Sequence, residues 1–280
     1  MRTSTKLYIL VFAIIFAVIL PPILCYIFIV RPADHTAGQD TSTNTGNEHT
    51  STEGLDTTDA AKSFTILIDP GHGGFDPGKV SPDGIMEKDI NLAIASKLAS
   101  ALTDQGFSVY LTRDSDKSLN SENASSKKTS DLKARTNLAT NVNADLYISI
   151  HQNSYSAEYV HGAQVFYPQG KEDEKVIADS KMLAEAVYEK ISLGLDDGTN
   201  RPVLAKGDAR ILKNVSVPTI IVECGFLSNN KEAELLESEE YQEKLAQFIY
   251  EGISEVNSLN KTQKSVENTF DSKLHDDENH

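Results

Sequence analysis

Four side chains of the kinds that bind metal ions or carry protons lie where strand-like runs end or where a helical pattern begins. His72 follows the apolar run 64–68 inside the glycine-rich stretch IDPGHGGFDPG, and Glu87 precedes the helical pattern. His151 follows LYISI, and Glu223 ends TIIVE. Two imidazoles and one carboxylate are the ligand set of many catalytic zinc sites, which keep a fourth position for water. A further carboxylate beside such a site can take a proton from that water, so the set predicts hydrolysis.

Each of these side chains also has a structural interpretation. His72 could sit in an exposed turn, and His151 could be a surface residue at a strand end. Glu87 could be a first-turn acid that interacts with the helix dipole, an effect worth about 0.3–1 kcal/mol. For Glu223 the alternative is a structural salt bridge. His161 opens a strand-like run and is more typical of an edge strand than of a metal site.

Glu223 is the most informative of the four on physical grounds. It follows the apolar run 220–222, which predicts a buried strand. A buried carboxylate is costly unless it is paired or coordinated, so it needs a chemical reason to be there. Cys224, the next residue, faces the opposite side if the strand continues, which predicts a thiol packed in the core.

Strand-like runs alternate with helical patterns around these residues, and this alternation predicts an α/β fold. We expect a single domain with a central mixed, mostly parallel twisted sheet flanked by helices. Strand-like runs cover 64–68, 107–112, 146–150, 163–167, 210–213 and 219–223, and helical patterns cover 88–105, 131–143, 174–193, closed by Gly194, and 232–256. Because a sheet fixes the ends of its strands while loops leave them accessible, the four side chains are expected on one rim.

The composition of the two ends separates them from this domain. Residues 7–30 form an uncharged segment that is long enough to span a bilayer. Because Arg2 and Lys6 before it favour the cytoplasmic side, the rest of the chain is expected outside. Segment 1–31 is therefore expected to be a membrane anchor, with a cleaved signal peptide as the alternative. Both interpretations export the domain.

The polar segments around the domain have no apolar period. Residues 32–62 predict a flexible linker, and residues 260–280 predict a disordered tail, which leaves 63–259 as the catalytic domain. The formal net charge of −15 argues against a nucleic-acid partner, whose phosphates require clusters of Lys and Arg. Since only Cys25 and Cys224 are present and the first lies in the apolar segment, no intramolecular disulfide is expected.

Six motifs in this order resemble the zinc-dependent N-acetylmuramoyl-L-alanine amidases of type 3. They cover nearly the whole predicted domain, which is far more specific than one glycine-rich loop. The motifs are IDPGHGGFDPG at 68–78, GIMEKDINL at 84–92, LTRDSD at 111–116, ARTNLATNVNADLYISIHQNS at 134–154, GAQVFY at 162–167 and VPTIIVECGFLSN at 217–229.

This resemblance implies a role for each of the four side chains. His72, Glu87 and His151 match the zinc ligands of the family, and Glu223 matches its catalytic glutamate. The family cleaves the amide bond between N-acetylmuramic acid and the L-alanine that begins the peptidoglycan stem peptide. The implied reaction is attack by zinc-activated water on that carbonyl, with Glu223 moving the proton to the leaving amine.

Substrate contacts are less well defined by the resemblance. Gln152 stands where many relatives carry alanine or another small residue, and Gln152 and Asn153 are candidates for substrate binding near His151. A guanidinium can bind a stem-peptide carboxylate bidentately, and Arg201, in the polar loop 196–208, is the best candidate. Arg113 and Arg135 are equally well explained by internal salt bridges.

The resemblance is strongest to the subgroup that acts on spore cortex peptidoglycan in sporulation and germination. It implies peptidoglycan as the partner, a membrane contact through the N-terminal helix, and a location on the outer face of the cytoplasmic membrane or in the wall or cortex. Some relatives need an activator, so an accessory protein is a further expectation. The alternatives are an exported zinc peptidase that cuts within the stem peptide and a catalytically silent wall-binding protein.

Overall fold

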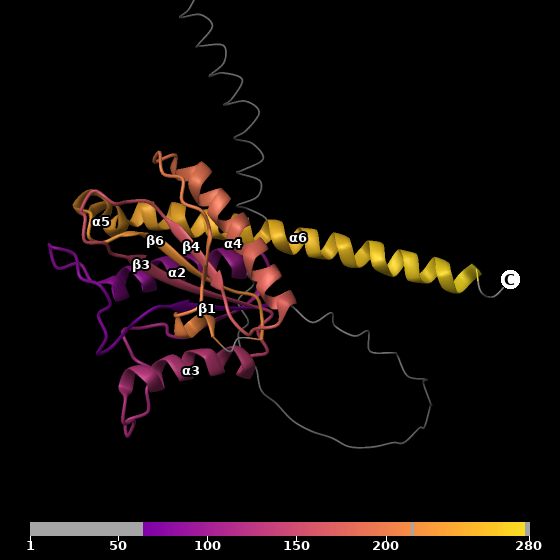
Figure 1. Ribbon diagram of the computed structural model, residues 1–280, viewed down its shortest axis with the longest axis horizontal. Coiled ribbons are helices and arrows are strands. Elements are labelled where there is room, and N and C mark those ends of the chain that lie inside the picture. The colour runs from indigo at the N-terminus through magenta and orange to yellow at the C-terminus, as the bar shows by residue number, and fades with distance from the viewer. Residues whose placement is uncertain (1–63, 214–215, 278–280) are drawn as a thin grey trace, which may run out of the picture. The chain divides into compact units, whose positions relative to one another are not determined.

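Six strands form one mixed sheet in the order β2-β1-β3-β6-β4-β5 (Figure 1). The computed structural model describes residues 64–213 and 216–277. All neighbouring strands are parallel except β4 and β6, which are antiparallel. This confirms the prediction of one α/β domain with a mixed, mostly parallel sheet. The strands are β1 Thr65–Pro70, β2 Ser108–Leu111, β3 Leu146–Asn153, β4 Gln164–Pro168, β5 Leu204–Lys206 and β6 Thr219–Phe226.

Helices cover both faces of the sheet. On one face α6 packs against both α2 and α4, and α2 and α4 pack against the strands, whereas α3 and η1 lie on the other face (Figure 1). The helices are α2 Glu87–Asp104, α3 Lys127–Asn141, α4 Glu174–Leu195, the 3-10 helix η1 Arg210–Leu212, α5 Asn230–Glu237 and α6 Glu239–Asp277.

The alternation of side chains along the central strands divides the core into two parts. Ile148 of β3 and Ile220 of β6 belong to the apolar cluster under α2, α4 and α6, and Cys224 lies in the same cluster, fully buried. Tyr147 and Ile221, one residue away, pack in the smaller cluster beneath α3 and η1. Since successive residues of a strand face opposite sides, His151 and Glu223 project on the α3 face. The prediction of a packed core thiol at Cys224 is confirmed.

The region before β6 differs from the prediction. Residues 210–213 were expected to form a strand, but Arg210–Leu212 is a 3-10 helix. Ile211 and Leu212 are consecutive, yet both pack in the same apolar cluster on one face of the sheet, which the alternating faces of a strand do not allow and a tight helical turn does. The strand of this region is β5, which pairs with β4 at the sheet edge and lacks a buried apolar face, so no periodicity marked it.

Element boundaries shift for identifiable reasons. The helix expected at 131–143 begins at Lys127, because Ser126 caps it by accepting a hydrogen bond from the Thr129 amide at 3.4 Å. Gly194, expected to terminate α4, lies inside it. A Cβ atom at that position would stand 2.2 Å from the Phe248 ring, so close packing against α6 explains the glycine. The helix ends instead at Leu195, and Asp196, which caps it, adopts a left-handed conformation.

The C-terminal segment is helical and not disordered as predicted. Helix α6 continues to Asp277, and its C-terminal part extends past the other elements (Figure 1). Residues 253–277 contain no glycine or proline, so nothing in the chain ends the helix at 259. The predicted anchor at 1–31 and linker at 32–62 lie outside the described residues. Within the part that the structure describes, no helix has the length and apolar character needed to cross a membrane.

Candidate metal centre

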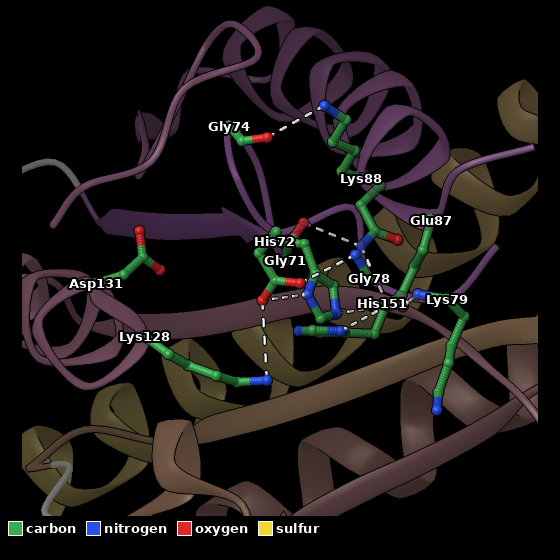
Figure 2. Close-up of polar contacts among 12 residues, drawn as sticks. Gly71, His72, Gly74, Gly78, Lys79, Glu87, Lys88, Lys128, Asp131 and His151 are labelled. Carbon is green, nitrogen blue, oxygen red and sulfur yellow. Dashed lines mark hydrogen bonds and ion pairs between the residues drawn. The ribbon is translucent and has the colours of Figure 1, made fainter. Parts of the chain in front are cut away.

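Three segments bring His72, Glu87 and His151 together at one end of the sheet. His72 lies in the loop after β1, and Glu87 is the first residue of α2. His151 lies near the C-terminal end of β3, where it pairs with β6. Glu87 Oε1 is 2.8 Å from His151 Nδ1 and 3.1 Å from His72 Nε2, and Figure 2 shows the two rings converging on this carboxylate. One donor atom of each residue lies within 4.8 Å of the others.

This group fits a metal ion on the chemistry of its donors. Two imidazole nitrogens and one carboxylate oxygen face a common point, which is the donor set of catalytic zinc sites. The Glu87 side chain is 2% exposed, and among the described residues the two imidazoles are its ion-pair partners. Burial alone would raise the pKa of Glu87, but the hydrogen bonds and charges of His151 and His72 hold it far below its usual value. Glu87 is therefore ionised, as a ligand must be.

The buried shell of α2 and β3 holds Glu87 in place. The Lys79 amide donates to Oε2 at 2.7 Å, and the Gln152 amide donates to Oε1 at 3.1 Å. The Asn91 carboxamide, one helical turn along α2, donates to Oε1 at 3.4 Å and to the Gly71 carbonyl at 3.1 Å. These donors leave the carboxylate one orientation, with Oε1 between the imidazoles.

Asp76 fixes the ring of His72. The Asp76 carboxylate lies 3.0 Å from His72 Nδ1 and accepts a hydrogen bond from the Gly78 amide at 3.1 Å. With Nδ1 bound in this way, Nε2 is the ring nitrogen that faces Glu87. A carboxylate behind a histidine is the common means of setting the tautomer of a metal ligand. Sequence reasoning missed Asp76, although it stands four residues after His72 in the same motif.

Glu223 occupies the neighbouring strand beside His151. The two residues are register partners on β6 and β3. Glu223 Oε2 is buried and has no hydrogen-bond partner, and among the described residues no cation forms an ion pair with this carboxylate. The alternative interpretation of Glu223, a structural salt bridge, is therefore wrong as far as the described residues are concerned. Burial raises the pKa of Glu223, while the charge of His151 counteracts the rise.

The position of Gln152 does not agree with its prediction as a substrate contact near His151. Its side chain is 3% exposed, and its amide donates to Asn91 of α2 at 3.1 Å. Because neighbouring residues of a strand face opposite sides, Gln152 projects away from the face that carries His151 and cannot contact substrate there. The Asn153 side chain accepts a hydrogen bond from the Ser154 amide at 2.8 Å and is half-buried.

The three candidate arginines donate hydrogen bonds to backbone carbonyls of the protein. Arg113 and Arg135 are at most 2% exposed, and both donate to backbone carbonyls around the His72 loop. Arg201 donates through Nε and one terminal nitrogen to the His161 carbonyl, at 3.1 and 2.8 Å, and lies over the Phe226 ring. His161 is exposed and is not part of the metal-binding group.

Fold and site together define a class, that of α/β enzymes whose strand-end side chains can hold a metal ion for hydrolysis. The model of the N-acetylmuramoyl-L-alanine amidase family matches residues 66–255. The chain belongs to this family.

Individual relatives agree with the family assignment. The germination-specific N-acetylmuramoyl-L-alanine amidase of Bacillus subtilis (strain 168) is 38% identical over 191 residues, which cover 67% of this chain and 77% of that protein. The structure of the CwlD amidase from Clostridioides difficile in complex with the GerS lipoprotein is 41% identical, with a TM-score of 0.66, and the match covers 70% of this chain and 100% of that one. The amidase AmiC2 of Nostoc punctiforme is 32% identical, with a TM-score of 0.60 and coverage of 70% and 97%.

Proposed function

We propose that this chain hydrolyses the amide bond between N-acetylmuramic acid and L-alanine of the peptidoglycan stem peptide, with a zinc ion held by His72, Glu87 and His151. The observation that carries the proposal is the buried, unpartnered oxygen of Glu223 beside this group. A carboxylate without a cation is costly in the folded chain, and a role in proton transfer explains why it is there.

Each residue of the group has a separate role in holding the zinc ion. When bound, the zinc ion supplies Lewis acidity, which polarises a substrate carbonyl and makes water a stronger nucleophile at neutral pH. His72 offers Nε2, His151 offers Nδ1, and Glu87 offers a charged oxygen between them. Asp76 keeps Nε2 of His72 free for the ion by binding Nδ1.

Glu223 acts as the proton carrier. Its raised pKa makes the carboxylate a better base than an exposed glutamate, so it accepts a proton from the attacking water. The protonated side chain then gives the proton to the nitrogen of L-alanine as the amide bond breaks. Glu223 can serve both steps because its Oε2 has no hydrogen-bond partner and no lysine or arginine among the described residues forms an ion pair with it.

The relatives support a narrower role outside the cytoplasm. A germination-specific amidase is among the similar proteins, which supports a function in spore cortex processing for this chain. The complex of the C. difficile amidase with a lipoprotein supports an accessory partner. Segment 1–31 remains the proposed membrane anchor or signal segment, and Asn153 and Arg201 remain proposed substrate contacts, Arg201 only if its bond to His161 is exchanged.

Digestion of purified cortex and vegetative peptidoglycan tests the reaction. An amidase leaves the glycan intact and releases stem peptides with free L-alanine amino termini, which mass spectrometry identifies. The Glu223→Gln variant keeps its bound zinc and loses about 10²- to 10⁴-fold in kcat, since only the proton carrier is removed. The His72→Ala variant loses zinc as well as activity.

Two outcomes would overturn the proposal. A Glu223→Gln variant with the native rate would remove this side chain from the mechanism. New amino termini inside the stem peptide, in place of L-alanine termini, would instead identify the zinc peptidase. Zinc content by elemental analysis accompanies both measurements.

A further inference from the structure

Helix α3 begins with two lysines, against the usual charge preference of a helix. Lys127 and Lys128 form its first turn, which contains no acidic residue. The positive end of the helix dipole disfavours cations there, and the whole chain is strongly acidic, with a net charge of −15. Positions where a local rule is broken tend to be functional, so the location of these lysines matters.

A small cavity joins this helix end to the metal centre. It measures about 40 Å³, enough for one group of the size of a methyl or a water molecule. His72, His151 and Lys128 are among the residues that line it. The remaining lining combines the apolar Phe75, Leu132 and Ile211 with Gly71 and the charged Asp69, Asp76, Asp131 and Arg135.

The ammonium group of Lys128 lies near this cavity with its donors available. Its nearest ion-pair partner is Asp76 Oδ2 at 3.9 Å, a distance too long for a hydrogen bond, and the side chain is 69% exposed. The Asp76 carboxylate already binds His72 and the Gly78 amide. Figure 2 shows Lys128 extending from α3 toward the two imidazoles.

Three other cations near the His72 loop, Arg113, Arg135 and Lys88, already bind groups of the protein. Arg113 and Arg135 are buried, and their nitrogens bind carbonyls of the loop and the carboxylates of Asp69 and Asp131. Lys88 is bound to Asp116 at 2.6 Å. Among the cations that line this cavity, Lys128 therefore keeps free donors for a ligand.

We propose that Lys128 and this cavity form the subsite for the stem peptide on the leaving-group side of the cleaved bond. The cavity takes the methyl group of L-alanine, and Lys128 binds the carboxylate of the residue that follows. This inference rests on the proposed function, because it assumes that the amide carbonyl lies at the metal centre. It also assigns the direction of the substrate, with the peptide over the N-terminus of α3.

Binding is measured by calorimetry with two synthetic muropeptides, which carry L-alanine followed by a residue with either a free carboxylate or the corresponding carboxamide. The full zinc-loaded chain carries Glu223→Gln, so that the substrate stays intact. Lys128→Met raises the Kd of the carboxylate form about tenfold and changes that of the carboxamide form little, because a charge-assisted hydrogen bond is lost only with the former. Lys128→Arg retains most of the affinity, and Lys133→Met, an exposed lysine on the same helix, changes neither Kd.

The outcomes separate this subsite from the proposed function. Equal losses for both muropeptides, or a Kd unchanged by Lys128→Met, would overturn the subsite even if the native chain hydrolyses both. The charge-dependent loss without any hydrolysis by the native chain would uphold a peptide-binding site and reject the amidase reaction. Zinc content is checked in each variant, so that an effect through Asp76 and His72 is recognised and counts against the subsite.

Discussion

At the scale of single residues, glycines set the space around the metal-binding side chains. A Cβ atom on Gly71 would stand 2.3 Å from the His151 ring, and one on Gly78 would stand 2.5 Å from Glu87 Oε2 and 2.8 Å from the His72 ring. His72 itself has a φ of 63°, in the left-handed region. The cost of so many glycines in one loop thus has a steric reason, since side chains there would displace the ligands.

Replacement of Gly78 by alanine tests this at one position. Gly78 has a φ of 70°, so alanine adds backbone strain of about 1–2 kcal/mol, and its Cβ atom also pushes Glu87 aside. We expect zinc affinity to fall at least tenfold. Gly84→Ala is the matched control, because Gly84 has a φ of 89° and nothing within 4 Å of the added atom. Zinc affinity lowered equally in both variants would show that strain, and not contact with the ligands, is responsible.

At the scale of elements, buried ion pairs attach the ligand loop to its neighbours. Arg135 of α3 donates to Asp69 Oδ1 of β1 at 2.7 Å and to the carbonyls of Pro70 and His72 at 2.8 and 2.5 Å. Arg113, just after β2, donates to the carbonyls of Pro70, Gly71 and Lys88. The loop therefore has its backbone acceptors satisfied by two different elements, which holds it in an irregular conformation.

The Asp69–Arg135 pair predicts a pH-dependent contribution to stability. Burial alone would raise the pKa of Asp69, but the Arg135 charge and hydrogen bonds from Thr112 and Ser149 lower it below 3.8. The contribution is present in full above the unfolded pKa of 3.8 and is lost as the pH falls toward the folded pKa. Asp69→Asn is expected to cost about 3 kcal/mol at pH 7, since Arg135 loses a buried counter-charge.

Urea unfolding of the metal-free chain between pH 7 and pH 3 checks this expectation. The gap in unfolding free energy between the native chain and Asp69→Asn should narrow as the pH drops below about 4. Asp83→Asn, on an exposed aspartate of the loop before α2, serves as the control and should follow the native chain at every pH. A gap that stays constant with pH would show that the loss comes from packing and not from the charge of Asp69.

At the scale of the whole molecule, the metal centre joins segments that are distant in sequence. The three candidate ligands come from the loop after β1, the start of α2 and the end of β3, so an intact site requires the folded sheet. An ion that binds only the folded chain stabilises it by mass action.

Zinc is therefore expected to raise the unfolding free energy of the native chain by about 4 kcal/mol at a free concentration 1,000 times its Kd. Urea unfolding with buffered zinc and with a chelator measures the difference. His72→Ala should show little of it, while Gly84→Ala, which keeps all three ligands, should show all of it. Equal stabilisation of His72→Ala would place the bound zinc at another site.

The sequence was sufficient to predict several features, and each has a local cause. The α/β class follows from alternating strand and helix patterns. The convergence of His72, Glu87, His151 and Glu223 follows because parallel strands end at the same edge of a sheet. The core position of Cys224 follows from the two-residue period of a strand. That same period places Gln152 away from His151, so this part of the site could have been predicted as well.

Only the tertiary structure decided the rest. Whether Arg135 binds substrate or Asp69 depends on a contact between residues 66 positions apart, and local patterns carry no information about such pairs. The same is true of Lys128, which lines one cavity with His72 and His151 although it lies on a helix of another part of the chain. The 3-10 turn at 210–212, the edge strand β5 and Gly194 inside α4 depend on packing against distant elements, which overrides local propensity.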